Sequence, residues 1–173
     1  MTAKDAEPRW LDDDEQRAWR AFVSMHTRLD AHLGRDLQAN TDLSTADFSV
    51  LVALTDVCQG RVRAFELSEA LQWEKSRLSH HLGRMAKRGL ITRGGCTEDG
   101  RGQFVEVTPA GRAAIEAAAP HHVETVRRLV FDTLTPEQVA ALGAISEAVL
   151  ARLNTERRPC AGPTDPCGPG PGA

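Results

Sequence analysis

Residues 67–91 read LSEALQWEKSRLSHHLGRMAKRGLI and decide the fold. Apolar residues recur there at intervals of three or four, at Leu67, Leu71, Leu78, Leu82 and Met85. Such spacing indicates two short amphipathic helices, over residues 65–71 and 75–88, with a break at residues 72–73. Two short helices joined by so tight a turn predict a helix-turn-helix unit.

The start of the second predicted helix is rich in hydrogen-bond donors and small polar groups. Side chains of this kind can reach base edges and phosphates when a helix lies in the major groove of DNA. The candidate DNA-binding residues of this helix are Lys75, Ser76, Arg77, Ser79, His80 and Arg84. A solvated helix face is the alternative interpretation of the same pattern. His81 lies nearer the apolar side, so we expect that histidine to be packed.

A glycine-rich segment follows this helix. Residues 94–102 read GGCTEDGRG and stand between an apolar stretch at 90–93 and the alternating sequence QFVEV at 103–107. Alternation with period two indicates a strand, and glycines between two strands indicate a hairpin loop. Arg101 stands at the expected tip, where a hairpin wing would carry its guanidinium group into an adjacent minor groove. A helix-turn-helix followed by such a wing predicts a winged helix.

Long helical segments flank this unit. Four carboxylates at 12–15 favour a helix N-terminus, and an apolar stripe runs from there to about Gln38. Further helix starts are predicted at Ser44, three residues before an acid, and at Thr108 and Thr135, each before a proline. The last predicted helix carries a stripe of Leu142, Ile145, Val149 and Leu153.

The predicted fold is mainly α with a small β wing, in one domain over residues 10–155. Its DNA-binding core covers about 44–108, and the flanking helices cover about 10–40 and 109–155. The small core cannot cover all the apolar stripes of these helices. We therefore expect them to form the interface of a homodimer, for which they are the dimerisation helices.

The two ends of the chain are expected to be loose. Residues 1–9 are predicted to be a flexible N-terminus and residues 156–173 a disordered tail. The last fifteen residues hold five of the nine prolines and four of the fourteen glycines, and they have no apolar periodicity. The chain has neither a membrane-length apolar run nor the pattern of a signal peptide at its start, which predicts a cytoplasmic protein without a membrane partner.

Charge is distributed unevenly along the 173 residues, whose net charge is −3. Residues 61–104 carry nine basic and five acidic residues, a net of +4, whereas residues 1–47 carry six basic and ten acidic residues, a net of −4. A basic block between acidic ones favours a nucleic-acid-binding unit whose flanks serve another purpose.

Enzymatic and metal-binding patterns are absent from the sequence. It contains no nucleophile elbow, phosphate-binding loop or dinucleotide fingerprint, so we expect no catalytic activity and no cofactor. The six histidines and four cysteines have no ligand spacing typical of a metal site. Cys58 is interpreted as a core residue and Cys96 as an exposed wing residue, which leaves oxidation of a thiol as a regulatory alternative.

Taken in order, these motifs resemble the MarR family of bacterial transcriptional regulators. The similarity covers residues 67–91 without a gap, the wing sequence Asp99-Gly-Arg101-Gly and the closing sequence Val107-Thr-Pro-Ala-Gly111, and it extends over roughly residues 10–155. The resemblance implies a homodimeric winged-helix protein that binds a pseudo-palindromic operator in double-stranded DNA. It also implies that Asp99 orients the wing arginine, Arg101.

The sequence departs from the family pattern at three positions. Glu74 stands where a serine or threonine usually begins the second helix, and Gln72 stands where the turn often has glycine. The wing has one arginine where many relatives have two adjacent ones.

The resemblance further implies a repressor released from DNA by a small aromatic or anionic ligand. Aromatic and cationic groups suit such a ligand, and the candidates are Trp19, Arg20, His26 and Trp73. For His26, a structural place at the dimer interface is the alternative. For the whole chain, the alternative function is a winged-helix protein-interaction module that does not read DNA, but such a module would not need the basic block.

Overall fold

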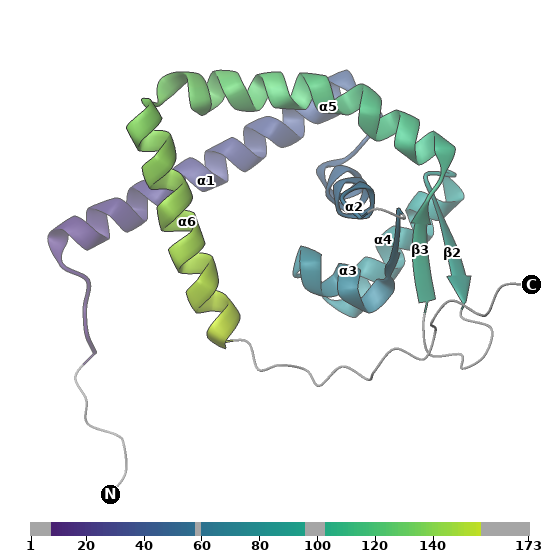
Figure 1. Ribbon diagram of the computed structural model, residues 1–173, viewed down its shortest axis with the longest axis horizontal. Helices are drawn as coiled ribbons and strands as arrows, with labels where there is room; N and C mark the ends of the chain where they lie inside the picture. Colours follow the sequence, from purple (N-terminus) through teal and green to yellow (C-terminus); the bar gives the residue numbers. More distant parts are fainter. Residues whose placement is uncertain (1–7, 58–59, 96–102, 157–173) are drawn as a thin grey trace, which may run out of the picture.

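The computed structural model consists of a small unit of helices and strands and of long helical arms that extend from it (Figure 1). It describes residues 8–57, 60–95 and 103–156. The first arm is α1 (Asp13–Asn40), and the second is α5 (Pro109–Leu129), followed by the 3-10 turn η1 (Phe131–Thr133) and by α6 (Pro136–Glu156). The central unit contains α2 (Thr45–Thr55), β1 (Arg61–Arg63), α3 (Ala64–Leu71), α4 (Lys75–Lys87), β2 (Ile91–Gly95) and β3 (Gln103–Val107).

This architecture confirms the predicted mainly α fold with a small β wing. The helix-turn-helix is formed by α3 and α4, whose bounds differ from the predicted ones by one residue at one end each. The sequence pattern missed β1, because three residues are too few to show a period of two. The predictions for residues 1–7, 58–59, 96–102 and 157–173 lie outside the described residues, and these include Cys58, Cys96, Asp99 and Arg101.

The helix starts predicted at residues 12–15 and at Ser44, Thr108 and Thr135 carry side-chain caps, whereas Glu74 makes no side-chain cap bond at the start of α4. Asp12 accepts a hydrogen bond from the amide of Glu15 at 2.8 Å, and the Glu15 side chain accepts one from the Asp12 amide at 3.0 Å. The hydroxyls of Thr108 and Thr135 accept hydrogen bonds from the amides three residues later, at 3.0 and 3.3 Å. A cap of this kind stabilises a helix by about 1 kcal/mol, which explains why the starts could be located from sequence.

The three strands form an antiparallel sheet in the order β1-β3-β2. Val62 of β1 pairs with Val105 of β3, and Ile91 of β2 pairs with Val107. Val105 is fully buried, whereas its neighbours on β3 are more exposed, as the alternation predicts. The hairpin of β2 and β3 is the base of the predicted wing.

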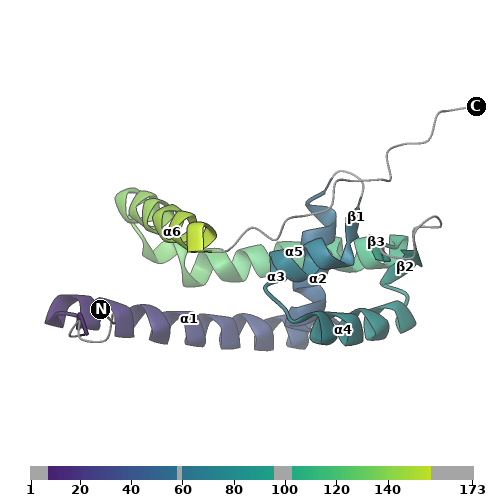
Figure 2. The same cartoon turned by 90° about the horizontal axis from the view of Figure 1, so that it is seen from below.

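The apolar core lies within the central unit. Its largest fully buried side chains come from α2, α3, α4 and the sheet: Val50, Leu51, Leu54, Leu67, Leu82, Met85, Ile91 and Val105. The arms add only Leu37 of α1 and Ile115 and Ala118 of α5 to this core. Figure 2 shows that α1 and α6 lie in different layers and that both extend away from the central unit.

A close backbone contact joins α5 to the central unit. The Thr108 amide donates to the carbonyl oxygen of Leu90 at 3.2 Å, and the Thr108 hydroxyl donates to that of Gly89 at 2.6 Å. A Cβ atom placed on Gly111, in the first turn of α5, would lie 2.0 Å from the Leu90 oxygen. The glycine at this position is therefore required by the approach of two backbones.

Replacing Gly111 with alanine should lower the free energy of unfolding by about 1–3 kcal/mol, because the added methyl group must push α5 away from Leu90. Urea denaturation followed by circular dichroism measures the effect. Gly94→Ala is the matched control, since no atom lies within 4 Å of its Cβ position. Equal stability of the Gly111→Ala variant and the wild type would contradict this account of the contact.

Candidate nucleic-acid interface

The turn between α3 and α4 is held by the side chain of Ser68 and by an unusual backbone conformation. Gln72 has φ of 55° and ψ of 37°, the left-handed region that favours glycine. The Ser68 hydroxyl donates to the Trp73 carbonyl at 2.6 Å, and the Trp73 amide donates back to the Ser68 carbonyl at 3.0 Å. These bonds close the turn, so the departure from glycine at Gln72 leaves the predicted geometry in place.

Trp73 connects this turn to the core. It packs against the core cluster, as does Leu78 in the second turn of α4, and its ring meets that of His81 edge-on at 5.4 Å between centroids. The guanidinium carbon of Arg77 lies 4.6 Å from the centroid of Trp73. Such a cation–π contact restricts the arginine side chain while leaving it exposed.

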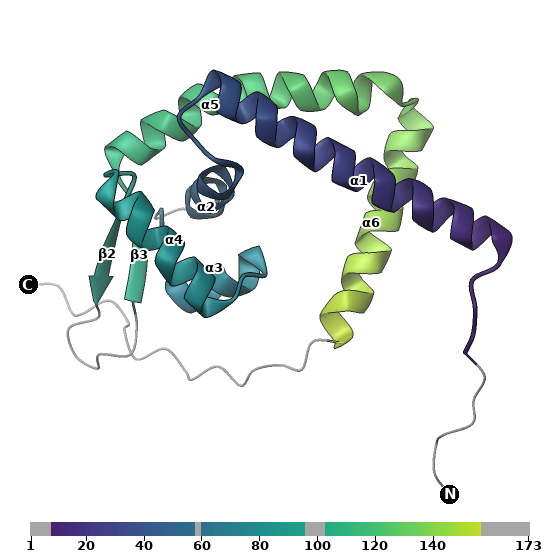
Figure 3. The ribbon, with the colours of Figure 1, turned by 180° about the vertical axis from the view of Figure 1, so that it is seen from behind.

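The exposed side of α4 carries all six of its candidate DNA-binding residues. Lys75, Ser76, Arg77, Ser79, His80 and Arg84 are exposed, whereas Leu78, His81, Leu82 and Met85 are buried. In Figure 3, α4 lies across the surface of the unit, in front of α2 and α3. The helix thus has one apolar side in the core and one polar, basic side open to a partner.

Arg93 of β2 links this helix to the base of the predicted wing. Its guanidinium group donates to the hydroxyl and the carbonyl of Ser79, each at 3.4 Å, and to the side-chain oxygen of Gln103 on β3. Sequence reasoning did not single out Arg93. A basic residue in a strand gives no local signal that it will reach a helix fourteen residues away.

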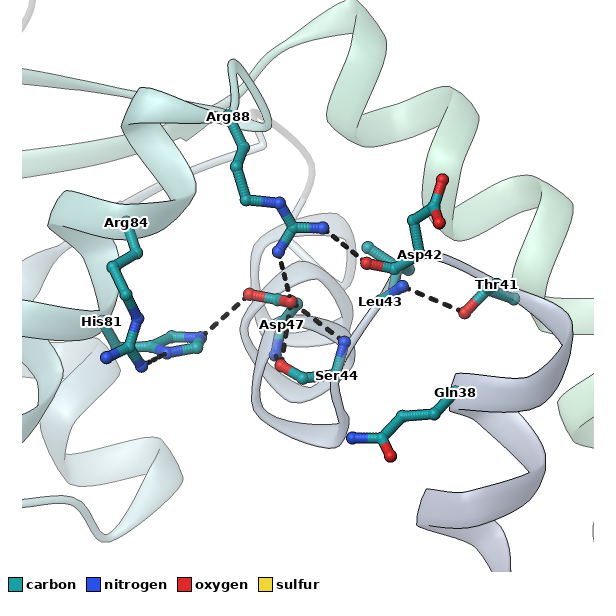
Figure 4. Close-up of a pocket in the computed structure, with 9 residues that line it drawn as sticks. All are labelled: Gln38, Thr41, Asp42, Leu43, Ser44, Asp47, His81, Arg84 and Arg88. Atoms are coloured by element: carbon teal, nitrogen blue, oxygen red, sulfur yellow. Dashed lines mark hydrogen bonds and ion pairs between the residues drawn. The ribbon is translucent and has the colours of Figure 1, made fainter.

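A buried carboxylate lies behind α4. Asp47, in the first turn of α2, accepts hydrogen bonds from the Ser44 amide at 3.0 Å, the Ser44 hydroxyl at 2.8 Å and Nη1 of Arg88 at 2.7 Å. Nε2 of His81 lies 3.1 Å from its other oxygen (Figure 4). Burial alone would raise the pKa of Asp47, but the bonds from Ser44 and Arg88 outweigh it and hold the pKa below its usual value.

His81 stands between this carboxylate and the exposed side of α4. Nη2 of Arg84 lies 2.9 Å from Nδ1 of His81, while Nε2 faces Asp47. Burial lowers the pKa of His81, and the charges of Arg84 and Arg77 lower it further against the opposing effect of Asp47. Because Arg84 can only donate, Nδ1 accepts and a neutral ring carries its proton on Nε2, which faces Asp47 at 3.1 Å without the geometry of a hydrogen bond. The expectation of a packed histidine is confirmed.

A pocket of about 420 Å³ adjoins this network where α1, α2 and α4 meet (Figure 4). It is lined by Gln38, Thr41, Asp42, Leu43, Ser44, Asp47, His81, Arg84 and Arg88. Asp47 appeared in the sequence only as a capping residue and Arg88 only as part of a family motif. Their pairing spans 41 residues and has no local signal.

The four candidate ligand residues lie in two places. Trp19, Arg20 and His26 are exposed on the first half of α1, where the rings of Trp19 and His26 each stack on Phe22, with centroids 5.8 and 6.2 Å apart. Trp73 lies at the turn before α4 instead and lines a second pocket with Arg77 and Arg84. The structure does not group the four within one chain, and a ligand site made from them stays a prediction.

Neither a metal-binding cluster nor a membrane-spanning helix is found in the described part of the chain. No group of three or more described His, Cys, Asp and Glu side chains is placed to hold a metal ion. None of the described helices is long and apolar enough to cross a membrane.

Comparison with known proteins finds the same architecture. The structure is similar to that of AbsC, a MarR family transcriptional regulator from Streptomyces coelicolor, with a TM-score of 0.80 and 36% identity over 86% of this chain and 100% of that one. It is also similar to Sco3205, a MarR family transcriptional regulator from the same organism solved in complex with DNA, with a TM-score of 0.79 and 40% identity over 84% of this chain and 91% of that one. The transcriptional regulator HosA of Escherichia coli is 30% identical over 134 residues, 78% of this chain and 91% of HosA. No family model matches the chain.

The lowered pKa of His81 predicts a pH-dependent stability. Because the unfolded chain binds a proton more readily than the folded one, stability should fall as the pH drops below about 6.5. His81→Gln should reduce that slope, by at most about 1.4 kcal/mol per pH unit. Part of the slope should remain, since burial also lowers the pKa of His122.

Urea denaturation at several pH values between 5 and 8 tests this prediction. The exposed neighbour His80 supplies the variant His80→Gln, which shows how much of the change comes from losing any histidine of α4. A His81→Gln variant with an unchanged slope would show that His81 does not titrate differently in the folded state.

Proposed function

The chain belongs to the MarR family of transcriptional regulators, and we propose that it binds a pseudo-palindromic operator in double-stranded DNA as a homodimer. In this proposal α4 is the recognition helix and enters the major groove. The wing that extends from β2 and β3 reaches the adjacent minor groove.

The observation that carries the proposal is the exposed side of α4. Six donors or small polar side chains lie there, three of them cationic, on a helix whose opposite side is fixed in the core. Arginine in the first turn of such a helix can form a bidentate contact with guanine, and lysine can pair with phosphate. A relative solved in complex with DNA supports this use of the fold.

The arms support the homodimer. Large apolar side chains stand exposed on both of them: Trp19, Phe22, Val23 and Met25 on α1, and Ile145, Val149, Leu150 and Leu153 on α6. Contiguous exposed apolar residues on this scale mark an interaction surface. A two-fold axis through the arms would cover them and place two copies of α4 about 34 Å apart, one turn of the double helix. The operator is then an inverted repeat with half-site centres one turn apart.

A protein-interaction module is the less favoured alternative. Such a module would have no need for the cations on α4, and the relatives found are transcriptional regulators rather than interaction modules or enzymes.

We propose repression, with release by a small aromatic or anionic ligand, as the mode of regulation. Release requires that the ligand bind more tightly to a conformation whose α4 spacing does not fit DNA. Salicylate at millimolar concentration should then lower the affinity of the protein for the operator. An unchanged affinity would contradict this form of the proposal.

Base readout by Arg77 can be separated from phosphate binding. Arg77→Ala should weaken binding to the operator more than binding to random duplex, by about 1–3 kcal/mol per half-site. Arg101→Ala should weaken binding to both duplexes and lower the salt slope by about one for each phosphate that the arginine neutralises.

Fluorescence anisotropy over a salt series makes this comparison, with an operator first selected from a random duplex pool. Arg128→Ala removes an exposed arginine of α5 and serves as the control. Equal losses of affinity on both duplexes for Arg77→Ala would assign base readout to another residue. If the wild type selected no duplex, the proposed function itself would fail.

Sedimentation at micromolar concentration tests the homodimer. The wild type should sediment at twice the subunit mass of 18.8 kDa. Ile145→Lys should shift it toward the monomer, because Ile145 is 63% exposed in the isolated chain and would bury a charge in the dimer. Glu147→Lys, an exposed charged position on the same helix, should leave the dimer intact. A stable wild-type monomer would contradict the assembly.

A further inference from the structure

We infer that Arg88, held in place by Asp47, is a positioning residue that ties the central unit to the end of the first arm, and that the angle it helps to fix sets the half-site spacing a dimer accepts. The inference rests on the proposed function, because α4 must be the element that reads DNA. It assigns a role to the polar junction of Figure 4, which reaches the exposed side of α4 at Arg84.

Both arms meet the central unit at the C-terminal end of α4. Arg88, the C-cap of α4, donates from Nη1 to Asp47 at 2.7 Å and from Nη2 to the carbonyl of Asp42 at 2.5 Å. Asp42 belongs to the short connection between α1 and α2, and Asp47 caps the first turn of α2. One guanidinium group therefore ties the end of α4 to the end of the first arm.

The second arm is attached one residue further along the chain. Gly89 and Leu90 accept hydrogen bonds from the side chain and the amide of Thr108, the N-cap of α5. Gly89 itself has φ of 74°, so the chain turns sharply between α4 and β2. Residues 88–90 are thus bonded to the α1–α2 connection through the Arg88 side chain and to α5 through the backbone.

The junction lies at one end of α4, and it acts together with the packing of Ile115 and Ala118 of α5 in the core to set the angle between α4 and the arms. The thirteen residues of α4 extend about 20 Å from the junction, at about 1.5 Å per residue. A rotation of about 10° at the junction would displace the far end of α4 by about 3.4 Å, the rise of one base pair. Because a dimer carries two such units, a small change of this angle alters the distance between the recognition helices.

The hydrogen bonds of Asp47 suit it to hold such an angle. Its side chain is 4% exposed, and its oxygens accept from α2 and from Arg88 while His81 of α4 stands 3.1 Å away. A buried carboxylate with several donors tolerates little displacement, because breaking any of these bonds leaves a desolvated charge. The fork of Arg88 bridges two acceptors at once, which the single ammonium group of a lysine cannot reproduce.

The spacing preference of the dimer tests the inference. Selected half-sites are placed in inverted repeats. Their separation varies from two base pairs fewer to two base pairs more than in the selected operator, and full-length protein is titrated against each duplex. Wild-type affinity should fall about tenfold for a change of one base pair. Arg88→Lys should bind the best duplex less tightly and flatten the profile to within about threefold.

Two further variants make the outcome specific. Lys87→Met removes the neighbouring exposed cation in the last turn of α4 and should keep the sharp profile of the wild type. Arg88→Gln should flatten the dependence of affinity on spacing as Arg88→Lys does. It therefore supplies a second measurement if either variant folds poorly. Thermal unfolding and sedimentation of every variant verify that only folded dimers are compared.

The outcomes separate the inference from the proposed function. A wild type that binds no duplex overturns both. A wild type that binds DNA without a spacing optimum overturns the inference alone, as do Arg88 variants that keep the wild-type profile or a Lys87→Met variant that flattens it equally.

Discussion

The carboxylate of Asp47 is the constraint on which the arrangement of the central unit depends. An ionised group this deeply buried is tolerated only when donors replace the water it has lost. Ser44 supplies two of those donors from the start of α2, and Arg88 supplies one from the end of α4. The start of α2, the end of α4 and the connection from α1 must therefore form together.

The same constraint explains why α4 can expose so many polar residues. Leu78, Leu82 and Met85 fix one side of the helix in the core, and Asp47 fixes its end through Arg88. The other side can then carry the cations Lys75, Arg77 and Arg84, which stay exposed. His81 joins the two sides, since one ring nitrogen faces Asp47 and the other faces Arg84 on the exposed surface.

The arms combine one polar contact with uncovered apolar surface. Where α1 passes α5, the Asp36 carboxylate accepts a hydrogen bond from Thr125 at 2.9 Å and lies 2.8 Å from His121. Beyond that contact the helices carry large exposed apolar side chains, and burying them contributes roughly 25 cal/mol for each Å² removed from water. The proposed partner is a second copy of the chain, because each copy presents the same uncovered stripe.

The amino-acid sequence by itself determined the helices, their caps, the helix-turn-helix, the β2–β3 hairpin and the candidate residues of α4. These features depend on residues within a few positions of one another, such as Asp12 with Glu15 or Thr108 with Gly111, so local spacing was enough to predict them. The burial of His81 also followed from its place on the helix. Strand β1, the link from Arg93 to Ser79 and the pairing of Asp47 with Arg88 were decided only by the tertiary structure. Asp47 and Arg88 lie 41 residues apart, and the contact between Gly111 and Leu90 likewise joins separate elements. Such pairs carry no periodic or capping signal, because their energy exists only after the folded backbone has brought the two groups together.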